Sequence, residues 1–183
     1  MDHHSNVLEV QRDVDEHSAI RTLIKLDPTT PPEVIKDTWD RLKTQEYMFD
    51  DIGKANGPEL WLRQIYDPMS ECYLYPDKGY VVLANIMAPV NANIHFSTFV
   101  DVDMLTLMQA RHEILDRAFK EIKLTRLTAM IPTPNKAAIR FATLSRFRFE
   151  GALKKAWLKN GQYSDIQLYG LLRDDYLRRE VTN

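Results

Sequence analysis

The strongest constraint on the fold of this sequence lies in its C-terminal third, between Ala118 and Tyr176. A helical pattern ends near Lys123, and Arg126 to Ile131 alternates in the way a strand does. Asn135 opens a second helix, and the pair Asn160–Gly161 is typical of a tight turn between two further strands. The resulting order of helix, strand, helix and hairpin is the part of the chain specific enough to indicate a fold.

The first part of the chain predicts one strand and two helices. The strand is Ile20–Leu26. A helix follows, with Thr30 as its cap and Glu33 closing a capping box. A loop at residues 50–58 then leads into a short second helix, for which Leu60 to Tyr66 supplies the apolar side chains.

The middle of the chain predicts a three-stranded meander followed by a long helix. The strands are Ser70–Tyr75, Tyr80–Met87 and Ile94–Val100, and apolar residues then repeat at helical spacing from Leu105 to Lys123. The whole chain therefore reads strand, helix, helix, three strands, helix, strand, helix, two strands.

The C-terminal pattern resembles the C-terminal half of GCN5-related N-acetyltransferases, especially the branch that acetylates protein N-termini, ribosomal proteins or small amines. The order of elements along the whole chain is similar too. The resemblance implies an α+β fold with a mixed, mostly antiparallel central sheet, helices on both faces, and two strands that splay at a cofactor cleft. The matching residues are Ala118-Phe119, Leu124, Arg126-Leu127, Asn135, Ala138, Leu144, Phe147, Glu150-Gly151, Asn160-Gly161 and Asp165.

Composition bounds the class of protein. The 183 residues, 44% hydrophobic and 27% charged, fit one globular domain, which we expect to span residues 18–183 after a flexible N-terminal arm at residues 1–17. Cys72 is the only cysteine, which excludes an intrachain disulfide and a cysteine-based zinc site. No apolar run reaches membrane-spanning length. These features indicate a cytoplasmic protein without a membrane partner.

The net charge of −2 conceals a strong asymmetry. From Arg111 onward the chain holds 15 basic and 8 acidic residues, whereas the first 110 residues hold 9 basic and 18 acidic ones. A polarised, solvated surface is one interpretation. The other is a basic surface for the phosphates of coenzyme A or for an acidic partner. We expect no nucleic-acid partner, because no basic run with interleaved aromatics is present.

The resemblance implies acetyl-CoA as co-substrate, yet the segment aligned with the phosphate-binding turn departs from the family pattern. Residues 102–107 contain no glycine, and Asp101 and Asp103 place negative charge where a pyrophosphate would bind the helix start. Asp103 is also a good helix cap. Side-chain donors for phosphate are left to Gln109 and Arg111, slightly further along.

The second cofactor element matches better. In the family, an asparagine at the start of the next helix lies near the pantetheine arm, and Asn135 occupies that position, with Ala138 and Phe141 on the same helix. A helix cap is an equally good interpretation of Asn135. Neither Ala138 nor Phe141 can donate the proton that a departing thiolate needs.

A general base must accept a proton from the attacking amine. His95 is the first candidate, because it lies mid-strand beside the expected cleft and titrates near neutrality. Glu71 on the neighbouring strand is the second, with Asp101 and Glu150 behind it, and Tyr169 on the last strand is a candidate acid. Each also has a structural interpretation, as a satisfied histidine, solvated carboxylates and a packing aromatic respectively.

Two functions therefore compete. The first is transfer of an acetyl group from acetyl-CoA to an amine of a protein, peptide or small molecule. The second is a non-enzymatic interaction role on the same scaffold, since the chain also has a looser likeness to degenerate acetyltransferase-like proteins of tailed bacteriophages. The second implies a virion location and partner. The hairpin at Asn160–Gly161 is a candidate contact for a homodimer.

Overall fold

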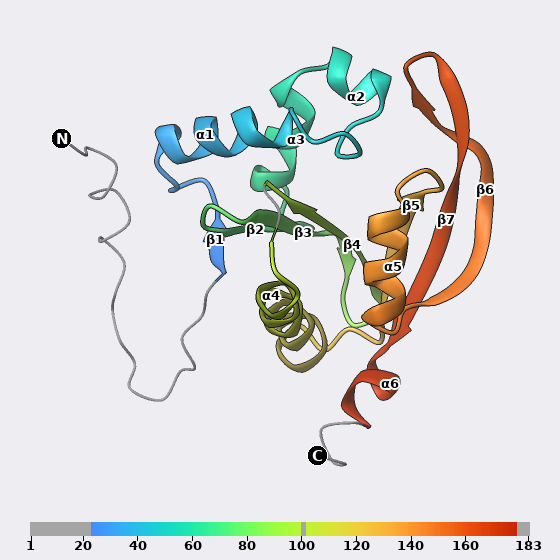
Figure 1. The fold of residues 1–183 in the computed structure, drawn as a ribbon. Coiled ribbons are helices and arrows are strands. Elements are labelled where there is room, and N and C mark those ends of the chain that lie inside the picture. Colours follow the sequence, from blue (N-terminus) through green and yellow to red (C-terminus); the bar gives the residue numbers. More distant parts are fainter. Residues whose placement is uncertain (1–22, 100–101, 179–183) are drawn as a thin grey trace.

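One seven-stranded sheet organises the residues that the computed structural model describes, 23–99 and 102–178 (Figure 1). The predicted arm at 1–17 lies outside these ranges, as do the first residues of the predicted Ile20–Leu26 strand, Val100 and Asp101. The strands are β1 (Ile24–Leu26), β2 (Glu71–Tyr75), β3 (Gly79–Met87), β4 (Asn91–Thr98), β5 (Arg126–Pro132), β6 (Arg148–Lys159) and β7 (Gln162–Leu172).

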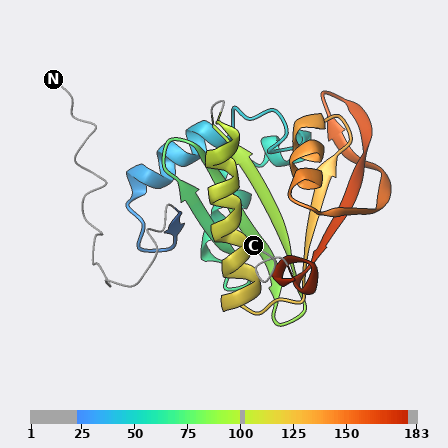
Figure 2. The same ribbon diagram turned by 60° about the horizontal axis from the view of Figure 1, so that its bottom comes forward.

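Helices cover both faces of this sheet (Figures 1 and 2). No helix in the described ranges is long and apolar enough to cross a membrane. The helices are α1 (Pro32–Leu42), α2 (Asp51–Ala55), α3 (Pro58–Tyr66), α4 (Met104–Asp116), its π-helical continuation η1 (Arg117–Glu121), α5 (Lys136–Leu144) and α6 (Arg173–Leu177).

The predicted fold class is confirmed. The strand order is β1-β2-β3-β4-β5-β7-β6, and every neighbouring pair is antiparallel except β4 and β5, which run parallel. The parallel pair requires a crossover, which α4 and η1 supply between the two strands. The sheet is thus two antiparallel halves joined along one parallel seam.

Alternate side chains of the strands build two apolar cores. Val81 and Leu83 of β3 pack with Ile114 and Phe119 on the face covered by α4, η1 and α5. Their neighbours on the same strand face a second core, which α1 and α3 close with Trp39, Leu42, Trp61 and Ile65. The period-2 geometry of a strand therefore splits one apolar run between two layers.

Two local predictions need correction, and the structure contains one helix that the sequence pattern does not predict. Thr30 does not cap α1: its hydroxyl accepts the amide of Asp27 at 2.9 Å, and the N-cap position belongs to Pro31 without a side-chain bond. The predicted loop at residues 50–58 contains the five-residue helix α2, which the Asp50 carboxylate caps. Helix α6 was not expected.

The tip of the β6–β7 hairpin is tied to the α2 region. The two carboxylate oxygens of Asp51 accept the amides of Asn160 and Gly161 at 3.0 and 2.9 Å, and the Lys159 ammonium donates to the Phe49 carbonyl at 2.9 Å. Figure 1 shows the hairpin rising beside α2. The predicted Asn160–Gly161 turn is present, and both residues have left-handed backbone angles.

A second set of charges ties β2 to the helix layer. The carboxylate of Glu71 accepts from Arg117 Nε at 2.9 Å, from Tyr73 Oη at 2.7 Å and from Lys25 Nζ at 3.0 Å. Burial alone would raise the pKa of Glu71, but these donors outweigh burial and lower its pKa to about 2. The side chain of Glu71 is only 12% exposed, so this cluster is a structural one.

We expect Glu71→Gln to lower the free energy of unfolding at pH 7 by an amount on the order of 2 kcal/mol. Because the folded pKa lies below the unfolded one, the wild-type contribution is present above about pH 5 and disappears as the pH falls toward 2. Urea unfolding at several pH values measures it. Glu59→Gln, which removes an exposed glutamate of α3, is the control. Parallel stability curves for wild type and Glu71→Gln would contradict this role.

Candidate functional site

The two parallel strands at the centre of the sheet separate after a short contact. Strands β4 and β5 pair only from Asn91 to Asn93 and from Arg126 to Thr128. Each strand stays paired on its other side, β4 with β3 up to Thr98 and β5 with β7 up to Pro132. The carboxyl ends of β4 and β5 therefore diverge, as the predicted splay requires.

A cavity of about 380 Å³ occupies this divergence. The residues of β4 and β5 beyond the paired segment line its walls, with α4 and α5 on one side and the loop of residues 45–48 on the other. Ile94 and Phe96 pack on the core beneath α4 and α5, whereas Met48 packs on the core beneath α1 and α3. The lining of the cavity thus includes residues that pack on both faces of the sheet.

Backbone groups face this gap. The Arg126 amide donates to the Val90 carbonyl at 3.1 Å, which shows that even-numbered residues of both strands point their peptide groups toward each other. The same alternation directs the peptide groups of Phe96, Thr98 and Met130 into the gap, beyond the last paired residues. A ligand in the gap therefore meets hydrogen-bond donors and acceptors on both strand edges.

His95 lines the cavity from mid-β4. Its side chain lies on the strand face opposite to Ile94 and Phe96, toward the loop of residues 45–48. The imidazole is accessible within the cavity, yet the surrounding protein desolvates it and lowers its pKa below the ordinary value. His95 forms no hydrogen bond with another described residue, so its ring nitrogens are available to a ligand.

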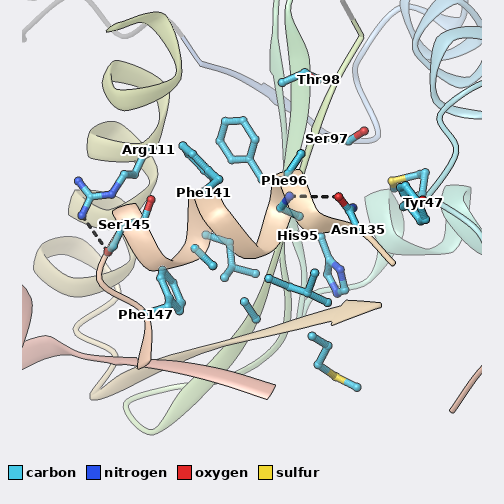
Figure 3. Close-up of a pocket in the computed structure, with 18 of the residues that line it drawn as sticks. Tyr47, His95, Phe96, Ser97, Thr98, Arg111, Asn135, Phe141, Ser145 and Phe147 are labelled. Atoms are coloured by element: carbon cyan, nitrogen blue, oxygen red, sulfur yellow. Dashed lines mark hydrogen bonds between the residues drawn. The ribbon is translucent and has the colours of Figure 1, made fainter. Parts of the chain in front are cut away.

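Asn135 caps α5 at the cavity wall. Its Oδ1 accepts the amide of Ala138 at 3.1 Å (Figure 3). The cap does not use the side-chain amide nitrogen of Asn135. Asn135, Ala138 and Phe141 all line the cavity. Phe141 packs against Phe96 with ring centroids 5.4 Å apart, which makes the middle of the cavity apolar. The cap and a ligand contact are compatible with each other.

The start of α4 is occupied by its own cap. Asp103 Oδ1 accepts the amide of Thr106 at 2.9 Å, and this bond, the largest cause, lowers the pKa of Asp103. The charged carboxylate sits at the helix end that would otherwise attract an anion. The described part of this turn therefore does not fit a phosphate-binding cradle.

The two side-chain donors predicted for phosphate differ in position. Gln109 is exposed and does not line the cavity. Arg111 does line it, and its Nη2 donates to the Ser145 carbonyl at 3.1 Å. Among the described lining residues Arg111 is the only Arg or Lys.

The remaining candidates lie elsewhere. Glu71 belongs to the ion-pair cluster described above, with a pKa too low for a base, and does not line the cavity. Tyr169 is buried in the core and donates to Gln167 Oε1 at 2.7 Å, also away from the cavity. Glu150 pairs with Arg126 at 2.6 Å. We therefore keep His95 and drop Glu71 and Tyr169 from the candidate site.

Sequence reasoning missed the loop that closes the cavity. Gln45, Glu46, Tyr47 and Met48 line it, although no motif marks them. No sequence feature marks this loop as part of a site, since the polar segment between two predicted helices has no helix or strand pattern. Within the described ranges, no group of three or more His, Cys, Asp or Glu side chains could hold a metal ion.

Comparison with known proteins gives a fold but no sequence family. No protein-family model matches the chain, and the search of curated proteins returns no significant match. Solved structures do match. A chimera of Vibrio cholerae spermidine N-acetyltransferase SpeG and hSSAT superposes with a TM-score of 0.68 at 18% identity, covering 87% of this chain and all of that one.

Two further structures of the Vibrio cholerae enzyme agree. Its complex with manganese ions has a TM-score of 0.65 at 18% identity, over 86% of this chain and 95% of that chain. Its dodecameric form in an intermediate state has the same score and identity, over 86% and 96%. The chain has the GCN5-related N-acetyltransferase fold. The identities are too low to carry the activity with the fold.

The cap of α5 generates a stability prediction. Asn135→Ala removes the bond to the Ala138 amide and should lower the free energy of unfolding by about 1 kcal/mol. Asn135→Asp retains a cap acceptor and should stay within a few tenths of the wild-type value. Urea denaturation compares the three proteins. Equal losses in both variants would mean that the bond does not stabilise α5.

Proposed function

We propose that this protein transfers an acetyl group from acetyl-CoA to an amine. The observation that carries the proposal is the cavity between β4 and β5, whose lining includes side chains from both faces of the sheet. A donor and an acceptor that enter from opposite faces meet within it. Holding both reactants in one cavity removes most of the entropic barrier to a bimolecular reaction.

Acetyl-CoA supplies the activated thioester, and two parts of the cavity suit its arm. The peptide groups of Phe96, Thr98 and Met130 offer hydrogen bonds to the amides of an extended chain. Asn135 and Phe141 line the α5 side, one polar and one apolar. Backbone amides in this gap are also suited to stabilise negative charge on a thioester oxygen.

His95 is the base in this proposal. It lies on the face of β4 that meets the 45–48 loop, the side from which an amine would approach. Because its pKa is lowered, the imidazole stays neutral and able to accept a proton at pH 7. No residue predicted from the sequence provides the matching acid.

The acceptor belongs to a broad class. The similar solved structures are named as spermidine N-acetyltransferases, and a small amine is therefore the first acceptor class to test. Glu46, which lines the cavity, would attract a cationic amine. Protein or peptide amines are further acceptor classes within the proposal. We also propose a homo-oligomer and a cytoplasmic location. The free, buried Cys72 is compatible with a reducing compartment.

One observation favours the alternative, a non-enzymatic role on the same fold, such as a virion component. Asp103 occupies the helix start where this fold would hold phosphates. Titration of acetyl-CoA into the purified protein by calorimetry separates the two. Saturable binding that a bulky Ala138→Trp variant abolishes supports the transferase. Absence of heat and of any thermal shift at millimolar acetyl-CoA would leave the scaffold role standing.

The role of His95 gives a kinetic prediction. His95→Gln should lower kcat/KM for a tested amine by about 10²–10⁴ while leaving acetyl-CoA affinity unchanged. Since the pKa of His95 is lowered, protonation of its imidazole should reduce the wild-type rate only below about pH 6.5. His112→Gln, which changes an exposed histidine on α4, is the matched control. A wild-type rate for His95→Gln would remove His95 from the mechanism.

A further inference from the structure

Two buried polar groups without partners meet at one end of the cavity. Arg111 Nε and Ser145 Oγ are inaccessible to solvent, and neither has a hydrogen-bond partner among the described residues. Both residues line the cavity, and Ser145 is only 2% exposed. A buried polar group left unpaired costs about 1–3 kcal/mol, so two at one place make this part of the cavity wall energetically unfavourable.

The two residues hold each other in place. Arg111 comes from the middle of α4, and Ser145 is the C-cap of α5. The bond from Arg111 Nη2 to the Ser145 carbonyl fixes the guanidinium beside the hydroxyl, as the dashed line in Figure 3 shows. The same bond places a cation at the negative end of α5. The bond therefore holds the guanidinium next to Ser145.

Within the described residues, the charge of Arg111 is met by the Ser145 carbonyl and not by a carboxylate. No carboxylate lies within 4.0 Å of its guanidinium there, and burial lowers its pKa. Arginine remains protonated even so. A half-buried cation is unfavourable unless an anion offsets it.

The two ends of the cavity differ in charge. In Figure 3, Arg111 lies at one end, Tyr47 at the other, and Phe96 and Phe141 between them. Along α5, Asn135 and Ser145 are ten residues apart, about 15 Å in an α-helix. Glu46, next to Tyr47, places a negative charge in the lining of the far end. An anion is thus attracted to the Arg111 end and repelled from the Glu46 end.

We propose that Arg111 and Ser145 form a binding site for an oxyanion, a phosphate or a carboxylate, carried on a ligand that extends through the apolar middle of the cavity. Under the proposed function, on which this reading of the ligand rests, the anion is either a phosphate of the donor or a carboxylate on its acyl group. The site is distinct from the start of α4, where Asp103 already fills the anion position.

Calorimetric titration of inorganic pyrophosphate and, separately, of succinate tests the site on the full chain. We expect at least one to bind, and Arg111→Gln to weaken that binding by about tenfold, with Arg111→Lys retaining part of it. Ser145→Ala should weaken binding by about threefold without lowering the melting temperature, because its hydroxyl has no partner to lose. Arg140→Gln removes the same charge from the exposed face of α5 and should change binding less than twofold.

The two probes separate the sources of the anion. Binding of pyrophosphate alone assigns the site to a phosphate, and binding of succinate alone assigns it to an acyl carboxylate. Failure of both probes to bind at millimolar concentration, or an equal loss in Arg140→Gln and Arg111→Gln, overturns the site. Neither readout needs acetyl-CoA, so pyrophosphate binding through Arg111 without acetyl-CoA binding would sink the transferase and leave this site intact.

Discussion

The separation of β4 from β5 is the constraint on which the rest of the structure depends. Each strand is held along its outer edge, β4 by β3 and β5 by β7, and the parallel pairing between them ends after three residues of each strand, where the gap opens. Peptide groups that lose their ladder partners must be satisfied by water or by a ligand. Opening the seam therefore creates both a space and a lining of hydrogen-bonding groups, whatever the side chains are.

Charge then decides what can occupy that space. In this chain the start of α4 carries the Asp103 cap, while the buried guanidinium of Arg111 lies further down the same helix. The proposed anion site therefore lies in the interhelical part of the cavity and not at the helix end. The acidic first half of the sequence contributes Glu46 to the opposite end. The charge asymmetry along the sequence thus reappears, in part, as a polarity across one cavity.

Sequence reasoning placed His95 and Asn135 correctly beside the gap because strand alternation and helix capping are local rules. The structure places Glu71 away from the cavity, and local rules do not show that Arg117, 46 residues away, would pair with that carboxylate. Tyr169 also lies away from the cavity, since the alternation of β7 shows that the ring faces one side but not that the core covers it. Partners distant in sequence decide whether a polar residue is free to react.

The sequence alone predicted the order of the elements apart from α2 and α6, and the hairpin at Asn160–Gly161, because periodicity and turn chemistry act over a few residues. The resemblance that these elements carry implied the α+β class. Only the tertiary structure decided where β4 and β5 part, that the 45–48 loop closes the cavity, and that Arg111 meets an unpaired Ser145 hydroxyl. These features depend on how α4 and α5 pack across the sheet. Packing brings together residues that no local pattern connects, and the candidate site consists almost entirely of such residues.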